Sequence, residues 1–359
     1  MRRVLLGLFG AALALAMIVF VGLRVPAVVD TLAVRMIESR LTEQRHELLE
    51  PDALRVLLCG TSSPFPHRTR AKACVAVFAE ERIWVVDIGP GATNELGLLG
   101  VDMSRVGAVL LTHFHSDHIG GLGELNLQGW ASGRVLPLQV YGPPGVERVV
   151  SGFNEAYALD SSYRTAHHGS SFMPLARSIM TPQVIEEPIY GDGPETVLEL
   201  GDLKITAFPV RHDPVRPAYG YRFDYLGRSV VISGDTARTP TLVDAAKGAD
   251  LLVHEAEANH IVAKVAEVAA EVGRPRVAKI MNDIQDYHTS ATQAAEAANR
   301  AEVGLLVLTH LAPPPPSSLA EHIFTRGVDE IRPEAWLLGS DGMLITLPAA
   351  SNTIEVDEL

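Results

Sequence analysis

Short apolar runs bounded by turn residues recur along the chain after residue 53. Runs of this kind predict β-strands, here at 54–60, 74–80, 82–89, 106–113, 136–142, 203–210, 219–225, 228–234, 250–256 and 303–310. Apolar residues that return every three to four positions predict helices, near 144–158, 240–248, 258–272 and 289–302. We therefore expect an α+β fold over residues 53–349, an αββα four-layer sandwich with a short tail at 350–359.

The N-terminus carries an uncharged apolar run from Val4 to Leu23, preceded by Arg2 and Arg3. As a helix this run would span roughly 30 Å, about the hydrocarbon thickness of a bilayer. We expect residues 1–24 to be a transmembrane anchor or signal segment, because a buried core helix seldom stays apolar on every face. The basic flank then predicts a membrane-anchored or exported protein with its catalytic domain on the extracytoplasmic side. Residues 25–52 predict an amphipathic linker helix.

The charge composition gives a weak argument against nucleic acid as a partner. The chain has 359 residues with a net charge of −13, and its two cysteines are Cys59 and Cys74. A negative field repels polyanions, so nucleic acid is an unlikely partner unless a local basic patch overrules it. The cysteines allow two alternatives, a disulfide in an oxidising compartment or a reduced pair of small buried hydrophobes.

The strongest chemical signal follows the predicted strand 106–113. Three histidines and an aspartate stand within six residues, at His113, His115, Asp117 and His118, and a glycine pair comes next. On a tight loop the first two can face one way and the last two the other, which would supply ligands to two adjacent metal ions. Imidazole and carboxylate are ligands that zinc accepts. An exposed polar loop without a function would explain the composition. It would not explain why the cluster directly follows a predicted strand and is followed by two glycines.

Three further strands end in residues of the same type, His212, Asp235 and His310. Each of them alone would more often be an ordinary loop residue. Because all follow the carboxyl ends of predicted strands, as the first cluster does, one rim of the sandwich can bring them together.

This ordered set resembles the metallo-β-lactamase superfamily, in the branch that includes ribonuclease Z and certain arylsulfatases, from about Leu54 to Leu347. The resemblance implies two zinc ions, although iron and manganese accept the same ligands. It implies that one metal is held by His113, His115 and His212, that the other is held by Asp117, His118 and His310, and that Asp235 bridges them.

The same resemblance implies a hydrolase that works through a metal-bridging hydroxide. Asp117 would orient the hydroxide, and His288 would assist the leaving group. Glu255 would orient a neighbouring histidine rather than bind metal. A simple strand end with an ion pair is the alternative for His254 and Glu255.

Candidate substrate-binding residues are Arg164, His167 and His168, which we place in a loop, and His67 in a rim loop. A guanidinium suits sulfate or phosphate. Exposed loops without a role explain these residues equally well.

The substrate is harder to infer. In ribonuclease Z an RNA-gripping arm lies between the matches to His212 and Asp235, where this chain has only 22 residues. We therefore expect a small anionic ester, either a sulfate ester or a phosphodiester, and an enzyme that is arylsulfatase-like or phosphodiesterase-like. The alternatives are ribonuclease Z-type processing of transfer RNA and a membrane-anchored metal sensor without catalysis. A homodimer is left open.

Overall fold

The computed structural model describes residues 9, 17, 19–42, 45–186 and 194–359. The chain divides into two compact units, residues 1–45 and residues 46–359. The first unit contains helix α2 (Pro26–Thr42). The apolar run predicted as a membrane segment lies mostly outside the described residues. Among the helices that are described, none is long and apolar enough to cross a bilayer.

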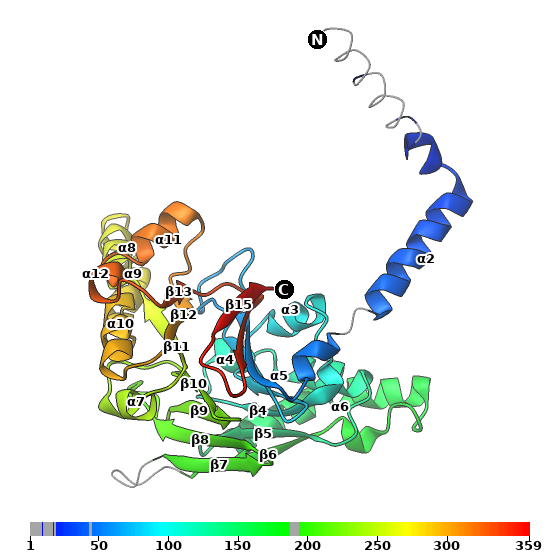
Figure 1. The fold of residues 1–359 in the computed structure, drawn as a ribbon, viewed down its shortest axis with the longest axis horizontal. Helices are drawn as coiled ribbons and strands as arrows, with labels where there is room; N and C mark the ends of the chain where they lie inside the picture. Colours follow the sequence, from blue (N-terminus) through cyan, green and yellow to red (C-terminus); the bar gives the residue numbers. More distant parts are fainter. Residues whose placement is uncertain (1–8, 10–16, 18, 43–44, 187–193) are drawn as a thin grey trace. The chain divides into compact units, whose positions relative to one another are not determined.

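The second unit is built on two sheets (Figure 1). The first has the strand order β15-β14-β1-β2-β3-β4-β5-β6 and the second β13-β12-β11-β10-β9-β8-β7. The first sheet comprises β1 (Ala53–Gly60), β2 (Cys74–Ala79), β3 (Arg82–Val86), β4 (Val106–Leu110), β5 (Leu138–Gly142), β6 (Met180–Val184), β14 (Met343–Pro348) and β15 (Glu355–Glu358). The second comprises β7 (Glu195–Leu200), β8 (Leu203–Pro209), β9 (Tyr219–Tyr225), β10 (Arg228–Ile232), β11 (Leu251–Glu257), β12 (Leu305–Ala312) and β13 (Trp336–Leu338).

Helices cover the outer face of each sheet. On the first sheet they are α3 (Ala92–Leu98), α5 (Leu122–Ala131) and α6 (Val146–His168), while the four-residue helix α4 (Ser116–Ile119) lies in the segment between β4 and α5. On the side of the second sheet they are α7 (Pro240–Ala245), α8 (Asn259–Glu271), α9 (Pro275–Asp283), α10 (Ala291–Arg300), α11 (Ser318–Phe324) and α12 (Val328–Ile331).

Three apolar cores separate these layers. One lies between the sheets, where Val77 and Tyr221 belong to the same cluster. A second joins the first sheet to its helices through residues such as Leu122. A third joins the second sheet to α7 and α10 through Leu242 and the alanines of α10. These layers confirm the predicted two-sheet α+β sandwich.

Several elements differ from the prediction. Helix α6 continues to His168, so Arg164, His167 and His168 are helical and not in a loop. The 350–359 tail contributes β15, which pairs with β14. Cys59 and Cys74 form a disulfide between β1 and β2, which decides between the two alternatives left by the sequence.

Candidate metal centre

Asp87, the residue that follows β3, holds the loop after β4 in place by hydrogen bonds. The backbone N–H and the hydroxyl of Thr112 donate to Asp87 at 2.8 and 2.7 Å. The hydroxyl of Tyr221, on the opposite sheet, donates to the carbonyl of Leu111 at 2.7 Å. The chain then turns into the short helix α4, where Asp117 and His118 are buried. Both sheets therefore hold the start of the histidine loop.

The other candidate ligands leave the second sheet at one edge, because β10, β11 and β12 run parallel. Asp235 follows Gly234, whose φ is +60°. A Cβ on Gly234 would lie 2.7 Å from the carbonyl oxygen of Tyr219, so only glycine fits there. His310 is the extra residue of a bulge between β11 and β12, with φ +45°. Bulges redirect a side chain, and this one turns His310 towards Asp235.

The candidate ligand atoms form two groups. The first group consists of three histidines and Asp235. His113 Nε2 lies 3.0 Å from His115 Nδ1, and His115 Nδ1 lies 3.4 Å from His212 Nε2. One donor atom from each of these three residues and from Asp235 falls within 4.8 Å of all the others. Four ligand atoms this close to one another can share one ion.

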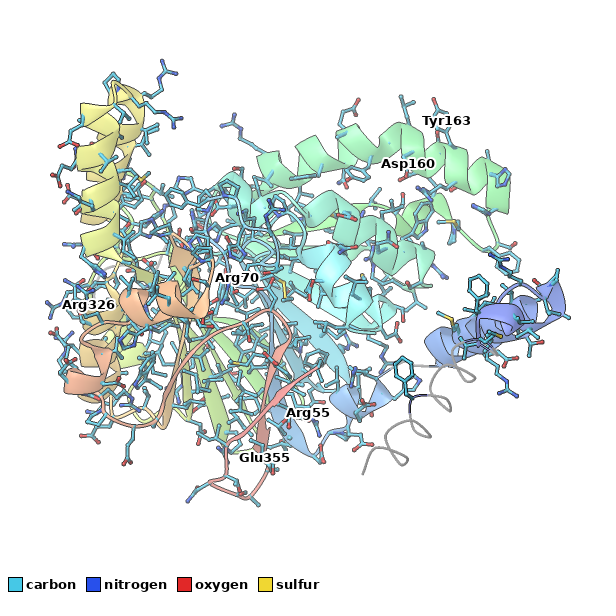
Figure 2. The ribbon with its side chains drawn as sticks, turned by 90° about the horizontal axis from the view of Figure 1, so that it is seen from above. Arg55, Arg70, Asp160, Tyr163, Arg326 and Glu355 are labelled. Carbon is cyan, nitrogen blue, oxygen red and sulfur yellow. A yellow bond between two sulfur atoms is a disulfide. The ribbon has the colours of Figure 1, made fainter. Side chains whose placement is uncertain are left out.

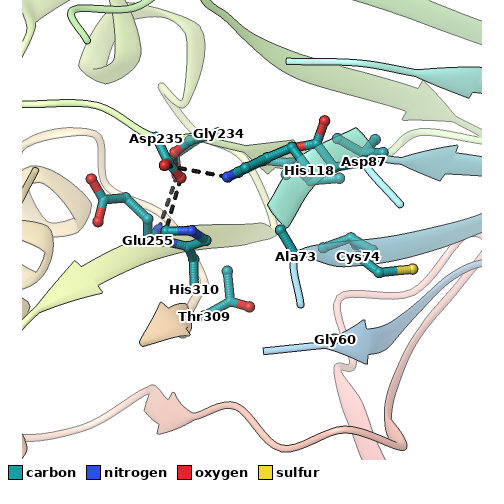
Figure 3. A pocket seen from close by; sticks show the side chains of 14 residues that line it. Gly60, Ala73, Cys74, Asp87, His118, Gly234, Asp235, Glu255, Thr309 and His310 are labelled. Carbon is teal, nitrogen blue, oxygen red and sulfur yellow. Dashed lines mark hydrogen bonds and ion pairs between the residues drawn. The ribbon is translucent and has the colours of Figure 1, made fainter. Parts of the chain in front are cut away.

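The second group lies on the other side of Asp235. His310 Nε2 is 3.2 Å from Asp117 Oδ2, and His118 Nε2 is 3.7 Å from the same oxygen. Asp235 contacts both groups, since its Oδ2 is 3.3 Å from His118 Nε2 and 3.8 Å from His113 Nε2. Figure 3 shows His118 and His310 converging on Asp235. The structure thus brings all seven predicted ligands together and places Asp235 between the two groups.

The chemistry of these donors fits two divalent cations. Within the described part of the chain, His118 Nε2, Asp235 Oδ1 and His310 Nδ1 are buried and have no hydrogen-bond partner. Burial, reinforced by neighbouring His118, lowers the pKa of His113 well below its usual value, which keeps that imidazole neutral. Burial raises the pKa of Asp235, but His310 and His118 outweigh it and hold that pKa well below its usual range. A neutral imidazole beside a buried carboxylate offers the lone pair and the negative charge that bind a divalent cation.

The second ring nitrogen of three ligands is also engaged. His118 Nδ1 lies 2.7 Å from Asp87 Oδ2, and His113 Nδ1 lies 3.0 Å from the hydroxyl of Thr112. His212 Nδ1 donates to the carbonyl of Tyr287 at 3.1 Å. Such contacts orient metal-binding histidines. Sequence reasoning missed Asp87, although a carboxylate inside the apolar run 82–89 was a signal that could have found it.

His288 and Glu255 form a pair beside the two ligand groups. His288 Nδ1 donates to Glu255 Oε1 at 3.0 Å, and the same oxygen accepts the backbone N–H of Thr236 and of Thr289 at 3.0 and 3.1 Å. Burial lowers the pKa of His288, but Glu255 and other carboxylates raise it to about 9. The His288 ring centroid lies 5.3 Å from that of His212. A protonated imidazole therefore stands next to the candidate metal centre.

The predicted substrate-binding residues are not joined to this centre. Arg164 is paired with Asp160 one turn away on α6, at 2.8 Å, and both side chains are partly exposed. His167 and His168 contact each other at the end of α6. His67 Nδ1 accepts the backbone N–H of Thr69. None of these described contacts reaches a candidate metal ligand.

A cavity of about 30 Å³ lies beside the carboxylate that joins the two groups. It is lined by His118, Asp235, Glu255 and His310 together with backbone and apolar atoms of both sheets (Figure 3). A space of this size holds one or two water molecules.

Comparisons with known proteins give the family. A family profile described as "Beta-lactamase superfamily domain" matches residues 85–311. A protein named Ribonuclease Z from Mycobacterium marinum is 37% identical over 263 residues, which are 72% of this chain and 87% of that protein. A Ribonuclease Z from Mycolicibacterium gilvum is also 37% identical over 263 residues, 72% of this chain and 85% of that protein.

Solved structures show the same fold. The metallo-beta-lactamase fold protein YhfI from Bacillus subtilis has a TM-score of 0.57 at 19% identity and covers 82% of this chain and 100% of its own. The short form of human tRNase Z has a TM-score of 0.58 at 21% identity, and the match covers 82% of this chain and 99% of that chain.

One prediction is corrected by these findings. The expectation of a membrane-anchored or exported protein with an extracytoplasmic domain is wrong. The similarity to ribonuclease Z overturns it, and no membrane-spanning helix occurs among the described residues. The relatives that this chain matches over most of its length are named for an action on RNA, a class of partner that the net charge of this chain does not favour. With its sandwich of two sheets and its His/Asp cluster, this chain belongs to the metallo-β-lactamase superfamily of metal-dependent hydrolases, in the branch of ribonuclease Z.

Proposed function

We propose that this protein is a dinuclear metal-dependent phosphodiesterase that cleaves RNA in the manner of ribonuclease Z. One observation carries the proposal. Seven His and Asp side chains converge beside the His288–Glu255 pair, in a chain 37% identical over 263 residues to a ribonuclease Z. His113, His115 and His212 would hold one metal, and Asp117, His118 and His310 the other, with Asp235 between them. Five imidazoles favour zinc over harder cations, while iron and manganese remain compatible.

The bound metals would supply Lewis acidity and lower the pKa of water towards neutrality. The protein supplies the remaining steps. Asp117 would accept a hydrogen bond from the attacking water, orient it towards phosphorus and take up the proton that the water loses. We assign His288 to the leaving group: its Nδ1 is held by Glu255, so Nε2 is the nitrogen that is left to donate. As the phosphorus–oxygen bond breaks, His288 Nε2 gives its proton to the departing oxygen.

Glu255 is a positioning residue in this scheme. It fixes the tautomer and orientation of His288 and stabilises the imidazolium, while two backbone N–H groups hold its own Oε1. Its other oxygen, Oε2, is buried and has no hydrogen-bond partner among the described residues.

A second candidate function is hydrolysis of a small sulfate ester or phosphodiester. It is favoured by the connection between His212 and Asp235, which contains a short loop at 213–218 and the tight β9–β10 hairpin with its turn at Leu226 and Gly227. No RNA-gripping arm leaves the sandwich at that place.

The test compares three substrates on the metal-loaded protein: precursor transfer RNA, a bis-aryl phosphate and an aryl sulfate. We expect chelator-sensitive cleavage of the RNA and the diester. His288→Ala should lower RNA cleavage about 10²- to 10⁴-fold, while His322→Ala, at an exposed position of α11, should leave it unchanged. Turnover of the aryl sulfate or of the bis-aryl phosphate without cleavage of the RNA would favour the second candidate. No turnover of any ester would indicate a metal-binding protein without catalysis.

A further inference from the structure

Helices α8 and α9 form a hairpin that has its own apolar core. The chain leaves the second sheet after Glu257 and returns at Tyr287. Between these points the two helices pack on each other, around a small cluster of Val262, Ala266, Met281 and Ile284, separate from the three layer cores. Figures 1 and 2 both show the pair at the edge of the domain. Helix α8 has 13 residues, so the turn of the hairpin lies about 20 Å from its base.

The base of this hairpin is fixed to the catalytic centre. Phe65 and Tyr287 pack against its apolar core. The Tyr287 ring centroid lies 4.9 Å from that of His212, and the Tyr287 carbonyl accepts His212 Nδ1. The residue after Tyr287 is His288. A ligand held along the hairpin is therefore aligned with the site where we place the chemistry.

The turn of the hairpin carries more positive than negative charge, although the chain as a whole has a net charge of −13. Arg274 and Arg276 stand in an exposed stretch from 271 to 276, which also contains Glu271. Lys264 and Lys279 are neutralised by Glu267 and Asp283, at 2.7 and 2.8 Å. In the described part of the chain, neither Arg274 nor Arg276 makes an ion pair. Two guanidinium groups at the end of the hairpin are thus free to bind an anion.

We propose that the α8–α9 hairpin is the RNA-binding arm of this protein, with Arg274 and Arg276 holding substrate phosphates about 20 Å from the scissile bond. The inference rests on the proposed function and names how that site takes its substrate. Guanidinium groups bind phosphate oxygens in a bidentate geometry. The hairpin takes the place of an arm between His212 and Asp235, where the chain has only a tight β-hairpin.

An anionic membrane surface is the competing partner, because Val268 and Val272 near the same turn are 43% and 64% exposed. RNA is favoured by continuity: the hairpin ends at His288, and a phosphodiester chain can occupy both the turn and the centre. A bilayer would contact the turn alone.

The experiment uses the full, metal-loaded chain and three double variants. R274A/R276A removes both charges, and R274K/R276K keeps them without the planar fork. R148A/R326A removes two exposed arginines elsewhere, on α6 and after α11. The Kd for an uncleavable 2′-O-methyl precursor transfer RNA is measured by fluorescence anisotropy over a range of salt concentrations. Turnover of a bis-aryl phosphate reports the state of the centre.

R274A/R276A should weaken RNA binding about tenfold at low salt and reduce the slope of log K against log salt by about 1.4 to 1.8, as expected for two lost phosphate contacts. Diester turnover should stay at the wild-type rate. R148A/R326A should bind as the wild type does, and R274K/R276K should keep the salt slope while losing part of the affinity.

Equal Kd and salt slope for R274A/R276A and R148A/R326A would overturn the inference. So would a loss confined to binding of vesicles containing anionic lipid, which would assign the turn to a membrane. Because these readouts measure binding, the result stands apart from cleavage: a wild type that binds RNA through the arm but hydrolyses no diester would refute the proposed function and leave the arm in place.

Discussion

Glu257, the last residue of β11, allows a test of how far burial controls the chemistry beside the metal centre. Its side chain is fully buried, and within the described part of the chain neither carboxylate oxygen has a hydrogen-bond partner. Burial raises the pKa of this carboxyl, the charge of His288 lowers it and Glu255 raises it again, to about 7 from an ordinary 4.5. The folded protein therefore binds a proton that the unfolded chain releases between pH 4.5 and 7.

This bound proton sets the sign of the pH dependence of the free energy of unfolding. Between these pH values the folded state holds more protons than the unfolded state, so the free energy of unfolding falls as the pH rises. A rise of about 2.5 pH units in pKa corresponds to about 3 kcal/mol at pH 8, of which less than about 1 kcal/mol is present at pH 5. Glu257→Gln removes the ionisation, so the variant should gain about 2.5 kcal/mol relative to the wild type between pH 5 and pH 8.

Urea unfolding of the metal-free protein at pH 5, 6, 7 and 8 measures this difference. Glu334→Gln, at an exposed position, is the control for the amide substitution and should track the wild type. A constant difference between Glu257→Gln and the wild type across the range would refute the reasoning, because it would mean that Glu257 does not change its charge there.

Three further predictions concern the groups around the centre. Asp87→Ala leaves His118 Nδ1 without its partner and should weaken metal binding about 10- to 100-fold in a competition titration; unchanged affinity would remove Asp87 from the account. Tyr221→Phe leaves the carbonyl of Leu111 unpaired and should cost about 1–3 kcal/mol of unfolding free energy, with an unchanged metal content. Glu255→Gln removes the largest effect that raises the pKa of His288 above its usual value, so the alkaline limb of the pH–rate profile should move from about 9 towards neutral pH; a limb that stays at about 9 would show that His288 is not the group that titrates.

The candidate centre could be predicted from sequence because its residues carry local signals. His113 to His118 are contiguous, and Asp235 and His310 each follow an apolar run that becomes a buried strand. Asp87 carried a weaker signal, since it is one carboxylate in an apolar run and its partner His118 lies 31 positions away. That contact arises only when β3 and β4 pair side by side.

Other elements were missed because their stability comes from pairing rather than from apolar pattern. Strand β15 has four exposed residues and exists through its pairing with β14. Strand β7, at the edge of the second sheet, has no fully buried residue. The end of α6 has too few apolar residues to be recognised as a helix, so its polar residues were assigned to a loop. The prediction of localisation rested on the apolar N-terminal run, most of which lies outside the described residues, and the similarity to ribonuclease Z overturns it.

Two cations held by seven side chains are the centre of the proposed mechanism, and anomalous scattering from crystals of the purified protein tests for them most directly. We predict two anomalous peaks about 3.5–4 Å apart, one within about 2.0–2.2 Å of nitrogens of His113, His115 and His212, the other equally close to Asp117, His118 and His310. Asp235 should contact both. A single peak, or peaks that these residues do not surround, would contradict the account.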